Sequence, residues 1–451
     1  MKHWAALLAV IALSSAVFIN TCTAACWNYS WFGKSTCDYR CHCDDNNNCD
    51  RETGQCADRC ALGWFGPACQ YRSILFFSDA GGPDLNWLTD GDPRSCNSGN
   101  TQTVTVELDK EHPLTWIRVV GNNSALIHRL ELSYRTKSGA SEDQACSDSQ
   151  TAKVDDFTLD ISCPTSEPVS HLTLSGPGVG VLCSLDISKG RNVAIAQETR
   201  QSSTFSTWYD RNAVDGNVGK VNGNEEDLSS TCTHTDSRYD DGWWSVTFET
   251  FVQVNSFVIY NRRNPSRRGC CEYRLIGFNL KAYNTSSVTR SSEVFDYTDP
   301  GPEYQDIYTI TPQDRIDGPV KKVRIVKNDK SNILTLCEVI VFGDSACDPG
   351  KFGRECEREC NCADDEEACF VSTGGCPSGC APGYTGEDCW TSCTHGKYGF
   401  GCLQTCSQHC VDPGNCDSVS GACVGGCQIG YEGPLCKESK TWIIVRVKRN
   451  I

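Results

Sequence analysis

The stretch WSVTF at residues 244–248 decides the fold class, because apolar and polar side chains alternate along it. Such alternation sends successive side chains to opposite faces of a strand, so that one face can be buried. Runs of the same kind recur at 104–108 and 323–326, and Gly, Asn, Asp and Ser separate them. Residues 71–344 are therefore predicted to be all-β.

Two halves of this region repeat one another. DGD at 90–92, followed by Cys96, matches DGN at 215–217, followed by Cys232. LCSLDI at 182–187 matches LCEVIV at 336–341. We therefore predict two tandem β-sandwiches, the first over residues 71–188 and the second over residues 189–344.

The repetition also predicts disulfides. Two cysteines hold the same places in both copies, so the two cysteines of each copy are expected to pair. In the second copy this leaves two adjacent cysteines to bond each other, although Cα atoms about 3.8 Å apart strain such a bridge. The predicted pairs are Cys96–Cys183, Cys146–Cys163, Cys232–Cys337 and Cys270–Cys271.

Three segments that flank the sandwiches carry eight cysteines each, at 25–70, 345–390 and 391–437. We call them the first, second and third cysteine modules. In all three, six residues precede the sixth cysteine, three precede the seventh and eight precede the eighth. Zinc binding is the less favoured alternative, because thiols of a secreted chain are usually oxidised. The modules resemble EGF-like repeats of the laminin and multiple-EGF type.

Composition and the chain start point to the secretory pathway. With 33 cysteines the chain suits an oxidising compartment, and residues 1–24 have the pattern of a signal peptide, with a signal anchor as the alternative. A net charge of -16 argues against nucleic acid as a partner. No other stretch, the tail at 438–451 included, has the roughly 20 apolar residues of a transmembrane helix.

Several motifs of the second sandwich resemble the F-type (fucose-binding) lectin domain, a jelly roll of the discoidin, or F5/8 type C, class. They are NAVDGN at 212–217, CTHT at 232–235, WW at 243–244, the arginines around CC at 270–271, and LCEV at 336–339. The resemblance implies that both sandwiches are discoidin-like jelly rolls.

In that family one histidine and two arginines bind L-fucose while a disulfide between adjacent cysteines packs on the sugar. The resemblance therefore implies a carbohydrate site made of His234, Arg267, Arg274, Cys270 and Cys271. Gly269 replaces a family aspartate and the segment before Arg267 is longer, so Arg262 or Arg263 is an alternative to Arg267. Trp208, Tyr209 or Leu228 could supply an apolar wall for the sugar.

The resemblance also implies a calcium site. Its residues would be Asn212, Asp215, Asn217, Thr231, Cys337 and Glu338. Carboxylate and carbonyl oxygens suit this hard cation. The alternative for the Asn- and Asp-rich loop is ordinary turn chemistry.

The first sandwich has no histidine after Cys96, and Ser184 stands where the second has Glu338. It is expected to be structural or protein-binding. The sequons predict glycosylation of Asn28, Asn122 and Asn284.

No motif of a catalytic site is present, so the chain is not predicted to be an enzyme. The favoured function is a secreted calcium-dependent lectin for fucosylated glycans on cells or microbes, acting in innate immunity. Because one shallow sugar site binds weakly, a homo-oligomer is expected. The alternative is an adhesion or scavenger-type protein that binds protein or lipid.

Overall fold

The computed structural model describes residues 31–32, 39–44, 48–77, 83–92, 94–97, 101–136, 143–147, 149–218, 231–236, 241–263, 271–327 and 333–440. Strands dominate these residues, and the α-helices α1 (Ile74–Phe77) and α2 (Ser124–Ile127) are single turns. The all-β fold class is thereby confirmed. The predicted signal peptide, Asn28 and residues 441–451 of the tail lie outside the described residues.

Residues 189–344, for which we keep the name second sandwich, form one antiparallel sheet of eight strands in their described part, six of them in the order β13-β20-β15-β19-β16-β17. Strand β15 is 19 residues long and exchanges its main partner at Val252, from β19 to β20; β14 pairs with its first part and β18 with its last. The strands are β13 (Arg191–Asn192), β14 (Glu198–Gln201), β15 (Trp243–Asn261), β16 (Phe278–Tyr283), β17 (Glu293–Thr298), β18 (Ile307–Ile310), β19 (Val320–Lys327) and β20 (Leu336–Ser345).

The alternation at 244–248 has the predicted consequence. Trp244, Val246 and Phe248 are at most 2% exposed and belong to one core with side chains of β19 and β20. Short 3-10 turns connect the strands and carry several candidate site residues. These turns are η3 (Asp210–Ala213), η5 (Glu272–Leu275) and η6 (Arg290–Ser292).

The first sandwich consists of two four-stranded antiparallel sheets with one core between them. One sheet has the order β12-β6-β10-β9 and the other has the order β5-β11-β7-β8. The strands are β5 (Thr103–His112), β6 (Trp116–Gly121), β7 (Glu131–Thr136), β8 (Gln144–Ala145), β9 (Gln150–Lys153), β10 (Thr158–Ser162), β11 (Val169–Ser175) and β12 (Leu182–Ser188). Turns η1 (Pro83–Leu88) and η2 (Pro177–Val181) lie at its ends.

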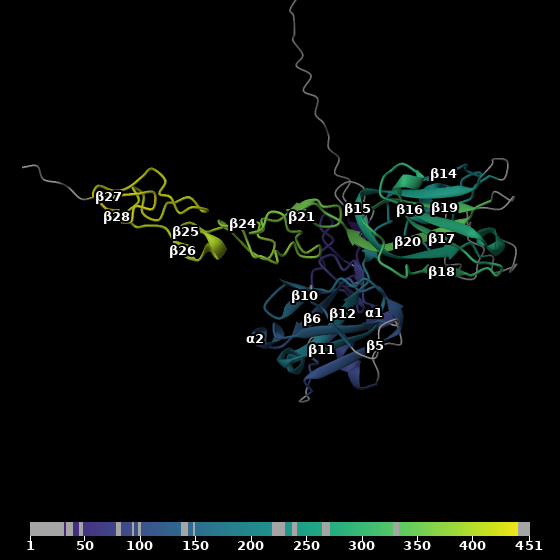
Figure 1. Ribbon diagram of the computed structural model, residues 1–451, viewed down its shortest axis with the longest axis horizontal. Coiled ribbons are helices and arrows are strands. Elements are labelled where there is room, and N and C mark those ends of the chain that lie inside the picture. The colour runs from purple at the N-terminus through teal and green to yellow at the C-terminus, as the bar shows by residue number, and fades with distance from the viewer. Residues whose placement is uncertain are drawn as a thin grey trace, which may run out of the picture.

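Figure 1 shows the two sandwiches side by side, with the second and third cysteine modules extending away as an arm. The modules contain only two-stranded pairs, so disulfides supply most of their cross-links. The short strands are β1 (Trp31–Phe32), β2 (Tyr39–Arg40), β3 (Trp64–Phe65), β4 (Tyr71–Arg72), β21 (Lys351–Phe352), β22 (Arg358–Glu359), β23 (Tyr384–Thr385), β24 (Thr391–Ser392), β25 (Lys397–Tyr398), β26 (Gln404–Thr405), β27 (Tyr431–Glu432) and β28 (Glu438–Ser439), with turn η7 (Phe400–Cys402).

The second and third modules share one disulfide connectivity. Their cysteines pair first with second, third with fifth, fourth with sixth and seventh with eighth. The three disulfides described in the first module follow the same order. Equal spacing in the sequence has therefore produced equal cross-linking.

The first sandwich binds its neighbours through the outer face of strand β6. Ile117 and Val119 point into the core, whereas Trp116 packs edge-on against Phe65 and Tyr71, with ring centroids 5.0 and 4.8 Å apart. Phe370 of the second module completes this cluster at 6.0 Å. One tryptophan thus contacts two cysteine modules.

A charged group beside this tryptophan strengthens the junction. Arg118 donates two hydrogen bonds to the buried carboxylate of Asp160, at 2.7 and 2.8 Å. Ser372 of the second module donates to the same carboxylate at 2.6 Å. On the other side, Tyr71 donates to Asp344 of the second sandwich at 2.7 Å. The junction therefore ties two modules and both sandwiches together.

Across the described part of the chain, no helix is long and apolar enough to cross a membrane.

Candidate functional site

His234 is nearly buried against two aromatic rings of the second sandwich. His234 is 8% exposed, and its imidazole contacts the rings of Phe205 and Trp208, whose centroids lie 4.8 and 5.6 Å from its own. The imidazole Nδ1 lies 2.6 Å from the carbonyl oxygen of Thr235. Because a carbonyl can only accept, Nδ1 must carry the proton in this contact.

The protonation of His234 fixes what its other nitrogen can do. Burial lowers its pKa, and the nearby guanidinium groups of Arg274 and Arg262 lower it further, whereas the Thr235 carbonyl acts in the opposite direction. The imidazole is therefore neutral at pH 7, and Nε2 is an acceptor. Arg274 donates to this Nε2 at 3.0 Å.

Two arginines reach this site from different elements. Arg274 comes from turn η5, directly after the cysteine pair, and Arg262 follows the last residue of β15. The guanidinium carbon of Arg262 lies 4.5 Å from the centre of the Trp208 ring. The Nε atoms of Arg262 and Arg274 are both buried and have no hydrogen-bond partner in the structure. Both side chains therefore hold unused donor capacity.

The surroundings of Arg262 lower its pKa. Burial lowers its pKa first, and the like charge of Arg274 lowers it second, while the carboxylate of Glu272 raises it. Two guanidinium groups close enough to repel one another favour a ligand that presents hydrogen-bond acceptors to both. Arg263 instead points toward Asp306, at 3.5 Å, so it is not part of this group.

Only one cysteine of the adjacent pair lies within the described residues. Cys271 is buried, 3% exposed, and disulfide-bonded. Its expected partner Cys270, together with Arg267, Gly269 and Leu228, lies outside the described residues. Of the five residues implied for the carbohydrate site, the structure therefore places His234, Cys271 and Arg274, and it adds Arg262.

The sequence interpretation missed Phe205. Its side chain is 47% exposed beside the imidazole, and its backbone N–H donates to the carbonyl of His234 at 3.0 Å. An aromatic ring that stays in water next to buried polar groups is a feature of sugar-binding surfaces. No local signal marks it, because residue 205 is far from residue 234 in the chain. Tyr209 takes no part in this contact and lies under Arg211.

The structure brings together residues from both halves of the predicted calcium site. Asp215, Asn217 and Glu338 line one cavity of about 420 Å³, next to the first cysteine module. The amide of Asn212 donates to the carbonyl of Cys232 at 3.0 Å, and Cys232 is bonded to Cys337. Thr231 precedes Cys232 and is buried. The two halves, more than 100 residues apart, thus meet at this disulfide.

Glu338 provides the test of whether these residues fit a cation. Its side chain is fully buried, and neither carboxylate oxygen has a hydrogen-bond partner in the structure. Burial and the neighbouring charge of Asp215 raise its pKa well above the usual value, although nearby peptide N–H groups oppose this. Burial also raises the pKa of Asp215 to about 6. A buried carboxylate without a hydrogen-bond partner, beside a second carboxylate that lines the same cavity, fits a hard cation with oxygen ligands.

Part of the same loop also shows the alternative chemistry. The backbone N–H of Asn217 donates to Asp215 Oδ1 at 2.8 Å, as in an ordinary Asx turn. This bond uses one oxygen of Asp215 and none of Glu338. Turn formation therefore accounts for the loop but not for the buried glutamate.

The first sandwich shares one disulfide position with the second but lacks these groups. Cys96 is bonded to Cys183, and Cys146 is bonded to Cys163. Ser184 stands at the place of Glu338, and the exposed Asp92 pairs with Arg94 at 2.9 Å. Asp92 stands at the place of Asn217, and Asp90, at the place of Asp215, accepts from the Asp92 backbone N–H at 2.8 Å. The first copy thus keeps the loop turn but lacks the buried carboxylate.

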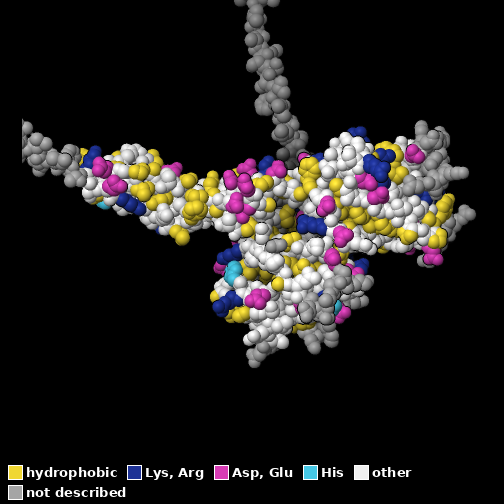
Figure 2. All heavy atoms as spheres, viewed as in Figure 1, with side chains coloured by type: hydrophobic (Ala, Val, Ile, Leu, Met, Phe, Trp, Pro, Cys, Tyr) yellow, Lys and Arg dark blue, Asp and Glu magenta, His cyan; other side chains and the backbone are white. Residues whose placement is uncertain are grey.

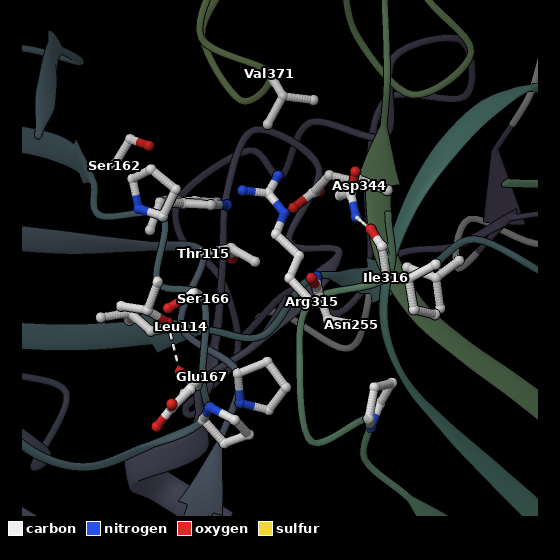
Figure 3. A pocket seen from close by; sticks show the side chains of 18 of the residues that line it. Leu114, Thr115, Ser162, Ser166, Glu167, Asn255, Arg315, Ile316, Asp344 and Val371 are labelled. Atoms are coloured by element: carbon white, nitrogen blue, oxygen red, sulfur yellow. Dashed lines mark hydrogen bonds between the residues drawn. The ribbon is translucent and has the colours of Figure 1, made fainter. Parts of the chain in front are cut away.

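A separate cavity of about 220 Å³ lies where the two sandwiches meet the second cysteine module. Figure 3 shows Arg315 extending into it between Thr115 of the first sandwich and Val371 of the module. The Arg315 backbone N–H donates to Ser166 at 3.0 Å, across the two sandwiches. This cavity belongs to the junction rather than to the site around His234.

The predicted glycosylation sites that can be located lie on the surface. Asn122 and Asn284 are both exposed. Their glycosylation stays a prediction.

Comparisons with known proteins give one family match, in the second sandwich. Residues 212–324 match a family of the F5/8 type C class that is described as the NedA-like, galactose-binding domain. The sequence matches no curated protein.

Solved structures of sugar-binding modules also match this chain. A fucose binding module of Streptococcus pneumoniae, SpX-3, is 31% identical over 34% of this chain and 96% of its own, with a TM-score of 0.27. The lectin domain of lectinolysin, in complex with the Lewis B antigen, is 25% identical over 34% and 96%, with a TM-score of 0.28. A fucolectin from the serum of striped bass, Morone saxatilis, is 19% identical over 62% and 99%, with a TM-score of 0.28.

The family match runs from residue 212, within turn η3, to residue 324, and it includes strand β15, Arg262 and Arg274. The chain thus carries, within its second sandwich, a galactose-binding-like domain of the F5/8 type C class.

Proposed function

We propose that the chain is an extracellular lectin whose second sandwich binds fucosylated glycans at His234, Arg262 and Arg274. One observation carries the proposal: a neutral imidazole acceptor lies between arginines with unused donors, beside an exposed aromatic ring. These groups lie together rather than dispersed over the surface. That clustering favours sugar binding over the adhesion or scavenger alternative.

The chemistry of a sugar hydroxyl matches this arrangement. A hydroxyl donates one hydrogen bond and accepts others, so it can take the place of Arg274 as the donor to Nε2 of His234 and at the same time accept from the Arg274 guanidinium. A second oxygen of the sugar can accept from Arg262. Hydrogen bonds from charged donors contribute about 1.5–3 kcal/mol each, more than neutral ones.

The apolar side of the ligand has a matching wall. Phe205 and Trp208 flank the imidazole, and the buried Cys271 lies next to the turn that carries Arg274. A deoxy sugar such as L-fucose presents a methyl group and an apolar ring face, which gain by leaving water. The combination favours fucose over a fully hydroxylated hexose.

Calcium would hold together the segments that carry the site and would not bind the sugar itself. Asn212, Asp215, Asn217, Thr231, Glu338 and the carbonyl of Cys337 would hold it. Bound calcium would offset the charge of the buried Glu338. Within the chain, these residues join η3 to β20, and so they hold the segment at 231–236 that carries His234.

Location and biological role belong to the same proposal. The disulfide-rich modules fit an oxidising extracellular environment, and a leader at 1–24 would direct secretion. Recognition of fucosylated surfaces by a secreted protein suits a role in innate immunity. The protein would act by binding, not by catalysis.

The test is calorimetric titration of the full chain, in calcium, with L-fucose and with D-galactose. Arg274→Ala and Arg262→Ala should each weaken L-fucose binding about 10- to 100-fold, because each removes a charged donor. Arg263→Ala is the matched control, since this neighbouring side chain points toward Asp306, and it should bind like the unmodified protein.

Three outcomes would contradict the proposal. The first is no heat with L-fucose from a folded protein. The second is equal binding by all three variants. The third is tighter binding of D-galactose than of L-fucose, which would assign the site to another sugar.

A further inference from the structure

Three units of the chain enclose the cavity at the junction, which we call the junction cavity. All residues that line it belong to the described part of the chain. Figure 2 shows the surface hollowed where the arm meets the two sandwiches, with hydrophobic and basic side chains around the hollow. Most of the lining residues lie within 113–116 and 162–168 of the first sandwich, 253–255 and 312–316 of the second, and 368–371 of the second cysteine module.

Trp116 brings an unused hydrogen-bond donor to this cavity. Its side chain is 2% exposed and packs on aromatic rings of both neighbouring modules, but its Nε1 atom is buried and has no hydrogen-bond partner in the structure. An indole N–H can only donate, and a buried donor without a partner costs free energy. A molecule in the cavity that carries an acceptor would supply the missing bond.

Arg315 brings further donors from the second sandwich. Figure 3 shows its side chain extending into the cavity, and its guanidinium has no ion pair or hydrogen bond within the described residues. The loop that carries it is held in place, because Gln253 Nε2 donates to the carbonyl of Ile316 at 3.2 Å. The Arg315 backbone N–H is also fixed, on the carbonyl of Ser166. The backbone below the guanidinium is therefore positioned before any ligand binds.

Both groups can only donate, and this sets the polar chemistry of the ligand. An ammonium group or a metal ion cannot bind to either of them. A carboxylate accepts from both, and a guanidinium can give it two parallel hydrogen bonds. The ligand that fits these two donors therefore carries a carboxylate.

The acidic residues of the lining limit the charge of this ligand. They are Glu167, Asp314 and Asp344, and within the described residues they do not form a group that could hold a metal ion. Asp344 already accepts from Tyr71, and in Figure 3 Glu167 lies apart from the guanidinium end of Arg315. Three carboxylates repel a ligand with several negative charges more than one with a single charge. A monocarboxylate is therefore favoured.

The rest of the wall is largely apolar and rigid. Its apolar members include Leu114, Pro164, Pro168, Ile316, Phe370 and Val371. Proline has a fixed backbone angle, which limits the movement of these segments. A cavity of roughly 150 Å³ holds benzene. The junction cavity, at about 220 Å³, therefore has room for one ring or a short chain with a carboxylate attached.

We propose that the junction cavity binds a small monocarboxylate with an apolar body, whose carboxylate accepts hydrogen bonds from Arg315 and Trp116. The apolar body lies against the proline rings and Phe370. Because such a ligand contacts both sandwiches and the second module, its binding also stabilises their arrangement. This site is separate from the proposed sugar site around His234 and does not depend on it.

The test is NMR spectroscopy of the full chain with isotope-labelled tryptophan, titrated with benzoate. Trp116→Phe identifies the indole N–H signal of Trp116 by its loss. Benzoate should shift this signal with a dissociation constant of about 1 mM or below, which a ligand of this size can reach. Benzamide has the same ring and no charge, so it should bind at least about tenfold more weakly.

Arg315→Gln should weaken benzoate binding at least about tenfold, because it removes the charge that faces the carboxylate. Arg315 is exposed and its backbone bond is kept, so this variant should fold. Arg290→Gln is the matched control, since Arg290 is an exposed arginine of turn η6, and it should bind like the unmodified protein.

The melting temperature is a second readout, which does not need the signal of Trp116. Benzoate should raise it more in the unmodified protein than in Arg315→Gln. No change of the Trp116 signal up to about 20 mM benzoate would overturn the proposal. Equal binding of benzoate and benzamide would also overturn it, because the carboxylate would then have no part. So would an affinity for benzoate that Arg315→Gln leaves unchanged.

Discussion

The two sandwiches share one disulfide position, Cys96–Cys183 in the first and Cys232–Cys337 in the second, but their polar residues serve different ends. The second keeps His234, Arg262 and Arg274 at one end with donors unsatisfied. The first pairs Arg118 with Asp160 and covers both with a cysteine module. The first sandwich thus uses its charged pair to hold its neighbours, whereas the second keeps polar groups without protein partners.

The difference follows from where charges are satisfied. In the first sandwich, Asp160 accepts from Arg118 and Ser372, so little capacity remains for a small molecule. In the second, Glu338 is buried with no hydrogen-bond partner in the structure. Satisfied groups stabilise an interface, whereas unsatisfied ones favour a ligand or an ion.

The largest effect is expected when the buried partner of Arg118 in the first sandwich is removed. Asp160→Ala leaves the mostly buried Arg118 without its bidentate partner, which should cost about 3–5 kcal/mol of unfolding free energy. The melting temperature, measured by calorimetry, should fall by several degrees. The exposed pair of Asp92 with Arg94 supplies the control, since Asp92→Ala should leave the melting temperature unchanged. Equal melting temperatures for both variants would refute the assignment of Asp160 to the junction.

The second prediction concerns the carboxylate that only the second sandwich has. Calcium at about 100 times its dissociation constant should stabilise the protein by about 2.7 kcal/mol and raise its melting temperature. Glu338→Gln should abolish this response. In chelator it should not lower the melting temperature, because burial already disfavours the charged form of Glu338. A calcium response that survives in Glu338→Gln would place the ion elsewhere.

The third prediction sharpens the sugar site. Phe205→Ala should weaken L-fucose binding about tenfold, since an exposed ring that the sugar covers contributes about 1–2 kcal/mol. Calorimetric titration measures this, with Phe251→Ala as the matched control, because its ring is 42% exposed and lies beside Lys321 instead. Unchanged affinity in Phe205→Ala would show that the ring does not contact the sugar.

The smallest effect concerns the contact between the second sandwich and the junction. Burial raises the pKa of Asp344 to about 6, above that of an unfolded aspartate. A raised folded pKa means that the protonated form is favoured in the folded state, so this group's contribution to stability increases as pH falls from 7.5 toward 5. Relative to Asp344→Asn, the unmodified protein should therefore gain a few degrees of melting temperature between pH 7.5 and 5.5. A constant difference across this range would mean that Asp344 does not titrate there.

Much of the site follows from the sequence because it depends on residues close together in the chain. Arg274 lies three residues after Cys271, so the motif places both in one turn. Arg262 was one of two alternatives, and only its packing on Trp208 separates it from Arg263. A motif with an insertion cannot specify which arginine points inward.

The sequence by itself determined the all-β class and the two disulfides at matching places, Cys96–Cys183 and Cys232–Cys337. Alternation of apolar and polar residues and the spacing of cysteines are local properties. They directly determine the strands and the disulfide pairs of the small modules. Only the tertiary structure decided that Phe205 lies beside His234, and that Trp116 and Asp160 face the cysteine modules. Those contacts join residues far apart in the chain, and packing between finished elements, not local pattern, selects them.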